Sequence, residues 1–291
     1  MKKLIKPCDI TAIIITYNEE KHISRCIDSL KHGVKKIFVL DSFSKDGTLK
    51  ILKKKKIQFK QKKFKNYANQ FNSAIQMAKI KTKWVLRIDA DEYLEKKFFL
   101  KLNIRLNKLN NSINGFNIIR RYIFNNKEIK YGGVFPQKKL RIWKNNKAKC
   151  EGYLFDDDMV CEPKVVDLDI SIYDHNLMGF KKWILKHKSY ANFEVQRHLQ
   201  NQKQINIKKI KKFTNYQKKI FYNKNILYYN FPILIRPLFL FLYRYFYKLG
   251  FLDGLNGFIF SLVQTFYYRS LIDIMIIKFY LKKFFLKNEK Y

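Results

Sequence analysis

Residues 84–92 read Trp-Val-Leu-Arg-Ile-Asp-Ala-Asp-Glu, an apolar segment that ends abruptly in acidic side chains. Residues 84–88 favour a buried strand, so Asp89 and Asp91 stand where that strand opens into a loop. In α/β proteins this end of the strands carries the chemistry. Two carboxylates one residue apart can share Mg²⁺, which prefers few protein oxygens together with substrate phosphates. Taken alone, the pattern also fits an ordinary solvated loop.

The residues before this segment alternate between strand and helix patterns. Residues 10–15 and 37–40 are β-favouring runs of the kind found in strands buried on both faces. Apolar residues recur at helical spacing over 23–30, and helices are also expected after Thr48 and over 67–78. This alternation predicts an α/β fold with a mostly parallel sheet and right-handed crossovers.

Polar clusters follow the first two predicted strands as well. Residues 16–20 read Thr-Tyr-Asn-Glu-Glu, and residues 41–48 read Asp-Ser-Phe-Ser-Lys-Asp-Gly-Thr. Either cluster alone fits the capping of the helix that follows it. Capping does not require acidic or amide clusters at three successive strand ends, and the set therefore indicates a binding site.

The charge of the chain is strongly positive, with 60 Lys and Arg against 23 Asp and Glu, a net charge of +37. Nucleic acid, an anionic membrane surface and a nucleotide-linked substrate are the candidate partners. Because many Asn, Ile, Phe and Tyr accompany the Lys, A+T-rich codons would produce the same excess. A nucleic-acid-binding protein stays open as an alternative class, although no nucleic-acid motif is recognisable and the strand-end acids would repel phosphate unless a metal intervened.

The four cysteines, at positions 8, 26, 150 and 161, show no C-x-x-C spacing, and reduced structural thiols are expected. The short apolar run after the N-terminal lysines does not fit a cleaved signal peptide. We therefore expect the protein to face the cytoplasm.

The later chain changes character. Residues 112–175 contain shorter β-like runs, 180–215 are helical in pattern and basic, and 226–286 are aromatic and apolar. The longest uncharged run there, 254–268, is 15 residues, shorter than the roughly 20 that a membrane-spanning helix needs. Arg236 interrupts the earlier apolar stretch. In-plane association with the membrane is expected, and a helical subdomain packed on the catalytic core is the alternative.

The motifs 16–20, 41–48, 67–74 and 89–92, in this order and roughly this spacing, resemble the family 2 glycosyltransferases with the GT-A fold. The resemblance is strong over about residues 10–100. It implies a catalytic domain over 1–215, with a nucleotide-binding half (1–110) and an acceptor half (111–215). A helical, basic and aromatic membrane-associating region would occupy 216–291.

The later part is similar to a narrower branch, the lipopolysaccharide core glycosyltransferases of the WaaE/KdtX type. The segments that carry this likeness are 141–143, 160–162, His175 and the Leu-Gly-Phe-Leu-Asp-Gly run at 249–254. Cys161 stands where that branch has a histidine, and whatever that histidine does is absent here or done otherwise.

The resemblance assigns roles to residues. A divalent metal, Mg²⁺ or Mn²⁺, would be bound by Asp91, with Asp89 and His175 as further metal-site residues. An inverting enzyme needs a base for the acceptor hydroxyl; Glu162 is the candidate, and Asp157 in the acidic run 156–158 is its rival. The expected nucleotide-sugar-binding residues are Thr16, Tyr17, Asn18, Glu19, Asp41, Asp46, Gln70, Asn72, Asp89, Ala90 and Asp91.

Among these residues, Asp41 is expected to contact the base of the donor, while Tyr17 and Glu19 line the nucleotide pocket. Gln70 and Asn72 could instead be plain amides on a helix face. The implied reaction moves a hexose, with UDP-glucose as the expected donor, onto lipopolysaccharide core or a related lipid-linked glycan at the inner face of the cytoplasmic membrane. A protein or another glycan is the alternative acceptor.

Overall fold

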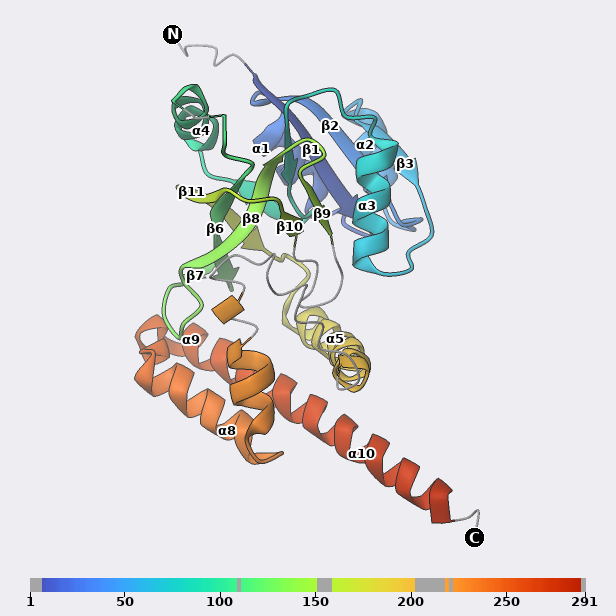
Figure 1. Cartoon of the computed structure of the whole chain (residues 1–291), viewed down its shortest axis with the longest axis vertical. Helices are drawn as coiled ribbons and strands as arrows, with labels where there is room; N and C mark the ends of the chain where they lie inside the picture. Colours follow the sequence, from blue (N-terminus) through green and yellow to red (C-terminus); the bar gives the residue numbers. More distant parts are fainter. Residues whose placement is uncertain (1–6, 109–110, 151–158, 202–217, 220–221, 289–291) are drawn as a thin grey trace. The chain divides into compact units, whose positions relative to one another are not determined.

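The structure, a computed structural model, describes residues 7–108, 111–150, 159–201, 218–219 and 222–288. The chain divides into two compact units, one of residues 1–126 and 136–177 and the other of 127–135 and 178–291. The domain boundary expected at residue 215 lies outside the described residues. Figure 1 labels the α-helices and most of the strands of the two units.

The first unit is built on one mixed sheet in the order β3-β2-β1-β4-β8-β6-β11-β5 (Figure 1). The pairs β3-β2, β2-β1, β1-β4 and β6-β11 are parallel, whereas β4-β8, β8-β6 and β11-β5 are antiparallel. The strands are β1 (Cys8–Thr16), β2 (Val34–Asp41), β3 (Gln58–Gln61), β4 (Trp84–Arg87), β5 (Glu92–Leu94), β6 (Gly115–Phe124), β8 (Gln137–Lys144) and β11 (Val165–His175).

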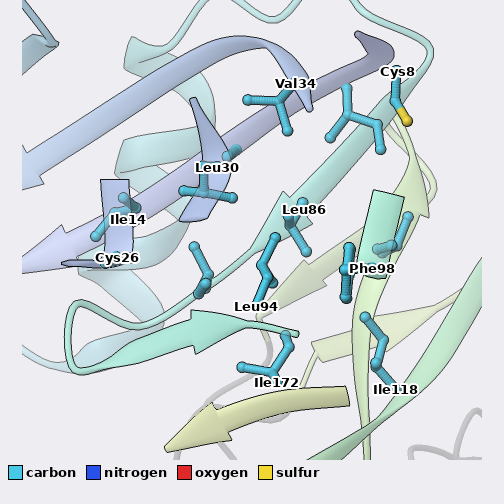
Figure 2. Packing of buried hydrophobic residues seen from close by; sticks show 14 of the residues in the cluster. Cys8, Ile14, Cys26, Leu30, Val34, Leu86, Leu94, Phe98, Ile118 and Ile172 are labelled. Carbon is cyan, nitrogen blue, oxygen red and sulfur yellow. The ribbon is translucent and has the colours of Figure 1, made fainter. Parts of the chain in front are cut away.

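Helices and a small hairpin cover the two faces of this sheet. The helices are α1 (Ile23–Leu30), α2 (Thr48–Lys54), α3 (Tyr67–Met77) and α4 (Phe98–Asn107), and the hairpin pairs β9 (Ala148–Cys150) with β10 (Met159–Cys161). Successive side chains of β1 point to opposite faces of the sheet, as strand geometry requires. Ile14 packs with Leu30 of α1 and Phe98 of α4 in one core cluster (Figure 2), whereas Ile13 joins Phe71 of α3 in another.

The α/β alternation expected over residues 10–88 is confirmed, since β1, α1, β2, α2, α3 and β4 each lie at their predicted positions. The sequence patterns described above did not predict the short strands β3 and β5 or helix α4. All four cysteines are buried and free. Burial raises the pKa of Cys161 to about 12, which keeps it a thiol.

The second unit is helical apart from the short strand β7 (Lys127–Ile129). Buried side chains of α5, among them Ala191 and Val195, pack against Ile272 and Ile276 of α10. Its elements are α5 (Phe180–Asn201), η1 (Asn223–Tyr228), α8 (Ile235–Leu242), η2 (Tyr243–Tyr247), η3 (Gly250–Asp253), α9 (Gly254–Ser261), η4 (Leu262–Tyr267) and α10 (Tyr268–Asn288).

Two buried clusters of paired side chains hold these helices together. The guanidinium of Arg236 on α8 makes a bidentate pair with the carboxylate of Asp273 on α10, with Nη2 to Oδ1 at 2.5 Å and Nε to Oδ2 at 3.0 Å. Glu194 on α5 pairs with Lys224 and accepts a 3.0 Å hydrogen bond from the hydroxyl of Tyr229. Arg236, which interrupts the apolar stretch in the sequence, is thus neutralised inside the fold.

The segment 249–254, one of the resemblance motifs, has a structural role in this unit. The carboxylate of Asp253 accepts hydrogen bonds from the backbone N–H of Lys130 at 3.0 Å and of Tyr131 at 2.9 Å. Gly257 lies so close that a Cβ there would stand 2.3 Å from the carbonyl oxygen of Gly250. Only glycine permits this approach of the two backbones.

Within the described residues, no single helix is long and apolar enough to cross a membrane. One pair, Ile235–Tyr247 with Gly250–Phe285, reaches the length and composition of a span only when taken together, and it is bent by 72°.

Candidate active site

The carboxyl ends of β1, β2 and β4 lie at the same edge of the sheet because these strands run parallel. Thr16 pairs in register with Asp41, and the backbone N–H of Ile88 donates to the carbonyl of Ile13 at 3.3 Å. The three polar segments that follow these strands therefore lie at one edge of the sheet. Ligands of open α/β sheets bind at this edge.

The loops after β1 and β2 are tied together by hydrogen bonds. The hydroxyl of Ser44 accepts from the backbone N–H of Asn18 at 2.8 Å, and Asn18 Oδ1 accepts from the N–H of Lys45 at 2.8 Å. Asn18 adopts the left-handed conformation with φ 56°, which asparagine tolerates well. Asp46 Oδ1 accepts from the N–H of Thr48 at 3.0 Å, at the start of α2. Asn18 and Asp46 thus fix the course of these two loops through backbone hydrogen bonds.

Asp41 is fully buried beneath these loops. Its Oδ2 accepts from the N–H of Ser44 at 2.9 Å and from Nε2 of Gln61 at 2.9 Å. Thr16 is also buried, whereas Tyr17 is 53% exposed at the rim. The contact of Asp41 with a nucleotide base stays a prediction, as does the role of Tyr17.

Glu19 connects α1 to the chain after β11. Its carboxylate lies 2.5 Å from Nδ1 of His22, and Nε2 of His22 accepts from the backbone N–H of Leu177 at 2.7 Å. Since Nε2 is the acceptor, Nδ1 carries the proton that is donated to Glu19. Glu19 therefore orients His22. This role differs from the expected one, which was to line the nucleotide pocket.

Gln70 and Asn72 on α3 both make structural hydrogen bonds. Nε2 of Gln70 donates to Ser42 at 2.9 Å and to the carbonyl of Lys62 at 3.1 Å. Asn72 makes a two-way pair with the backbone of Cys150, donating to its carbonyl at 2.8 Å and accepting from its N–H at 3.0 Å. This pair fixes α3 to β9, in line with the alternative that these amides serve the helix face.

The acidic turn after β4 rests on a buried network of arginines that the sequence did not indicate. Nη2 of Arg141 on β8 donates to Glu92 at 2.5 Å and to Asp89 at 3.1 Å, and Arg87 approaches Asp89 at 3.4 Å. Arg120 on β6 lies 3.3 Å from Glu92. The second carboxylate oxygen of Glu92 accepts from the backbone N–H of Asp89 at 2.9 Å. The network thereby fixes the course of the turn.

These neighbours separate the pKa values of the two acids. Burial opposes the ionisation of Asp89, but Arg141 and Arg87 outweigh it and hold the pKa of that carboxyl well below its usual range. Burial raises the pKa of Glu92, and the nearby charge of Asp89 adds to the increase. Asp89 is ionised at neutral pH, and both its oxygens face guanidinium groups. The buried Ala90 separates it from Asp91.

Asp91 and His175 are brought together, although they are far apart in the sequence. The backbone N–H of His175 donates to the carbonyl of Asp91 at 3.2 Å. Arg25 on α1 binds both residues, with Nη2 donating to the carbonyl of Asp91 at 3.1 Å and to that of His175 at 2.6 Å. Its Nη1 lies 3.0 Å from Nδ1 of His175. Nothing in the sequence singles out Arg25 for this role.

The side chains at this edge supply only part of the ligands that a hard divalent cation needs. Among the residues that the structure describes, no group of three His, Cys, Asp or Glu could hold a metal by itself. Mg²⁺ needs only one or two protein carboxylates when a substrate supplies phosphate oxygens, and Asp91 fits that requirement. Burial and Arg25 lower the pKa of His175, so its ring is neutral at neutral pH. Because Arg25 donates to Nδ1, the proton is on Nε2, and His175 could ligate only after releasing Arg25.

The structure describes only one of the two candidates for the base. Glu162, directly after β10, has a 56% exposed side chain and pairs with Nζ of Lys147 at 2.8 Å. Asp157 and its two acidic neighbours lie outside the described residues. The role of Glu162 as the base thus remains a prediction. In that role Glu162 would have to contact the acceptor as well as Lys147.

Comparison with known sequences decides the family. The family described as "Glycosyl transferase family 2" matches residues 11–163, more than half of the chain and all three strand-end segments. The chain belongs to family 2 of the glycosyltransferases. The mixed sheet described above is accordingly the GT-A fold of this family, and the predicted enzyme class and fold are confirmed.

Relatives of this glycosyltransferase share only part of their length with it. The SPbeta prophage-derived glycosyltransferase SunS of Bacillus subtilis is 39% identical over 90 residues, which cover 30% of this chain and 21% of SunS. The lipopolysaccharide core biosynthesis glycosyltransferase LpsC of Rhizobium meliloti is 29% identical over 155 residues, 50% of this chain and 54% of LpsC. The chain thus spans about a fifth of SunS and about half of LpsC.

Among solved structures, that of S. aureus TarS residues 1–349 in complex with UDP-GlcNAc is similar, with a TM-score of 0.47 and 14% sequence identity. The match covers 91% of this chain and 90% of that one.

Proposed function

We propose that this family 2 glycosyltransferase moves a hexose from a nucleotide sugar, with UDP-glucose as the expected donor, onto lipopolysaccharide core or a related lipid-linked glycan. The observation that carries the donor half is the position of Asp91, at the sheet edge where Thr16 and Asp41 also end their strands. The acceptor half is supported by the similarity to LpsC, whose name assigns it to lipopolysaccharide core biosynthesis.

Donor binding would use the edge of the sheet. Asp91 would hold a divalent cation, Mg²⁺ or Mn²⁺, together with the diphosphate of the donor, and the cation would neutralise the charge that develops on the leaving diphosphate. Asp89, held by two arginines, is better placed to accept a hydrogen bond from the donor or from water than to ligate directly. His175 would join once Arg25 releases its ring, and until then its Nε2–H can donate to a phosphate oxygen.

Transfer with inversion requires removal of the acceptor hydroxyl's proton as that hydroxyl attacks the sugar. Glu162 would accept this proton, and Asp157 is the rival. Lys147, whose Nζ lies 2.8 Å from the carboxylate of Glu162, is the neighbour of this candidate base. The reaction would take place at the inner face of the cytoplasmic membrane, where a lipid-linked acceptor is accessible.

The experiment is a screen of nucleotide sugars for UDP release by the purified full-length chain, with Mg²⁺, with Mn²⁺ and with a chelator. We expect release from UDP-glucose that needs the cation and is abolished in Asp91→Asn. The matched control is Asp28→Asn, whose exposed carboxylate contacts Lys55 and Ser24, and it should retain full activity. Full activity of Asp91→Asn would overturn the assignment, and release from another sugar would replace glucose.

The acceptor is tested separately by offering lipopolysaccharide core, another glycan and a protein to the active enzyme. Transfer to core supports the proposal, whereas transfer only to the protein or the other glycan would overturn its acceptor half.

A further inference from the structure

The second unit carries many exposed apolar side chains along α8, η2 and the start of α9. We name these side chains the aromatic surface; Tyr247 and Leu255 are its most exposed members, at 73% and 72%. Exposed apolar patches on a protein surface mark sites of interaction. Its main residues are Leu238, Phe239, Leu242, Phe246, Tyr247 and Leu255.

The last described turns of α10 are exposed on every side and combine aromatic residues with lysines. At 100° per residue, Tyr280, Leu281, Phe284 and Phe285 fall on one side of the helix, and Phe279 falls on the other side between Lys282 and Lys283. Exposed aromatic residues interspersed with lysines are typical of segments that lie in the plane of a membrane interface.

The charge of this unit is one-sided. Residues 127–135 and 178–291 contain 24 Lys and Arg but only 5 Asp and Glu. Three of the four acids that the structure describes here are engaged within the unit: Glu194 with Lys224, Asp273 with Arg236, and Asp253 with the backbone of Lys130 and Tyr131. The charges left beside the apolar side chains, such as Lys248 and Lys278, are therefore cationic.

We propose that the second unit docks on an anionic lipid bilayer. The aromatic surface and the apolar side of α10 enter the boundary between headgroups and acyl chains, while lysines 278, 282 and 283 contact anionic headgroups. This deepens the proposed localisation and rests on it. A second copy of the chain fits the surface poorly, because it would bring two cationic faces together. The 72° bend favours a segment that lies in one leaflet.

The test is flotation of the full-length protein with phosphatidylcholine vesicles, with and without phosphatidylglycerol. We expect strong binding only with the anionic lipid, and loss of that binding as salt shortens the screening length from about 10 Å at 0.1 M to about 3 Å at 1 M. The triple variant Lys278→Gln, Lys282→Gln, Lys283→Gln should bind about 100-fold more weakly, at roughly 1 kcal/mol per lysine. Phe246→Ser with Tyr247→Ser should also weaken binding at least about tenfold.

A matched control removes the same charge from the other unit. Lys50→Gln, Lys53→Gln, Lys54→Gln on α2 should float like the native protein. The substituted side chains are exposed, and circular dichroism checks that each variant is folded. Asp91→Asn should float normally even if it is inactive, which separates this proposal from the catalytic one.

Three results would overturn the proposal. One is equal binding to neutral vesicles, and another is equal loss in the α2 control. The third is a dimer in sedimentation equilibrium without lipid that Phe246→Ser with Tyr247→Ser converts to monomer, because the surface would then be occupied by a second copy.

Discussion

Arg141 and Glu92 form an ion pair at 2.5 Å in the interior of the first unit, directly beneath the acidic turn that ends β4. Both side chains are almost completely buried, and the same guanidinium also reaches Asp89. The acidic turn is therefore supported from β8.

Removing the cation of this pair should destabilise the fold strongly. Arg141→Met would remove the hydrogen bonds that Glu92 and Asp89 accept from this guanidinium and leave Glu92 buried without that partner, and we expect a loss of about 3–5 kcal/mol in the free energy of unfolding. Urea denaturation measures it. The double variant Arg141→Met, Glu92→Gln replaces the buried carboxyl that has lost its partner and should recover at least about 1 kcal/mol. If the two changes simply add, the pair is not coupled.

Arg25 is expected to set the affinity for the cation. Arg25→Gln frees the carbonyls of Asp91 and His175, and residues that orient metal ligands typically change affinity 10–100-fold. The Mn²⁺ concentration for half-maximal UDP release should rise at least about tenfold. Arg25→Lys retains the positive charge and one donor group. Its Mn²⁺ concentration for half-maximal release should lie between those of the native protein and Arg25→Gln. An unchanged Mn²⁺ dependence would show that Arg25 only supports the fold.

Glu162→Gln should lose transfer while still binding the donor, if Glu162 is the base. Lys147→Gln is its control, because it breaks the same ion pair without removing the carboxylate and should keep most of the turnover. Transfer rates and donor binding by calorimetry distinguish these cases. Unchanged turnover in Glu162→Gln would direct attention to Asp157.

Asn72→Ala tests whether this amide binds donor or only joins α3 to β9. Loss of its two hydrogen bonds to Cys150 should cost about 1–3 kcal/mol of stability. The Michaelis constant for the donor should stay the same. A donor constant raised several-fold at unchanged stability would instead restore the nucleotide-binding role.

The stability of the second unit should depend on acid through Glu194. Burial opposes its ionisation, but Lys224 and Arg269 outweigh it and lower its pKa to about 2. A carboxyl with a depressed pKa stabilises the fold above its unfolded value of 4.5, and this contribution is lost as the pH falls toward 2. It is on the order of 3 kcal/mol.

Unfolding by urea at pH 7 and pH 3 measures this dependence. Glu194→Gln should be less stable at pH 7 and should show a smaller loss on acidification. Asp28→Asn, an exposed acid in the first unit, serves as control and should behave like the native protein. An acid dependence unchanged in Glu194→Gln would contradict the assignment.

The sequence predicts the parts of this molecule that depend on local pattern. Strands β1, β2 and β4 and their polar ends follow from apolar runs bounded by turn residues, and parallel pairing then brings those ends to one edge. The arginine network could not be predicted, because it depends on β8 pairing between β4 and β6. The pairing of β8 with β4 joins residues 56–60 positions apart, and an arginine in an apolar strand gives no sign of its partner.

The same limit applies in the second unit. In the sequence, Arg236 interrupts an apolar stretch and argues against a membrane-spanning helix. Its partner Asp273 is 37 positions away, and only the fold shows that the two charges neutralise each other. The roles of Asn72 and Asp253 were hidden for a similar reason, since each binds backbone groups of a distant segment.

The internal placement of Glu194, Asp253 and Asp273 has a consequence for how the second unit would respond to its surroundings. The charged side chains on its described exterior are mainly lysine and arginine, which keep their charge well above neutral pH. A shift of one or two pH units around neutrality would leave the attraction to anionic lipid almost unchanged. Ionic strength and the anionic lipid content of the bilayer would set its strength, so the protein would respond to membrane composition and hardly at all to acidity.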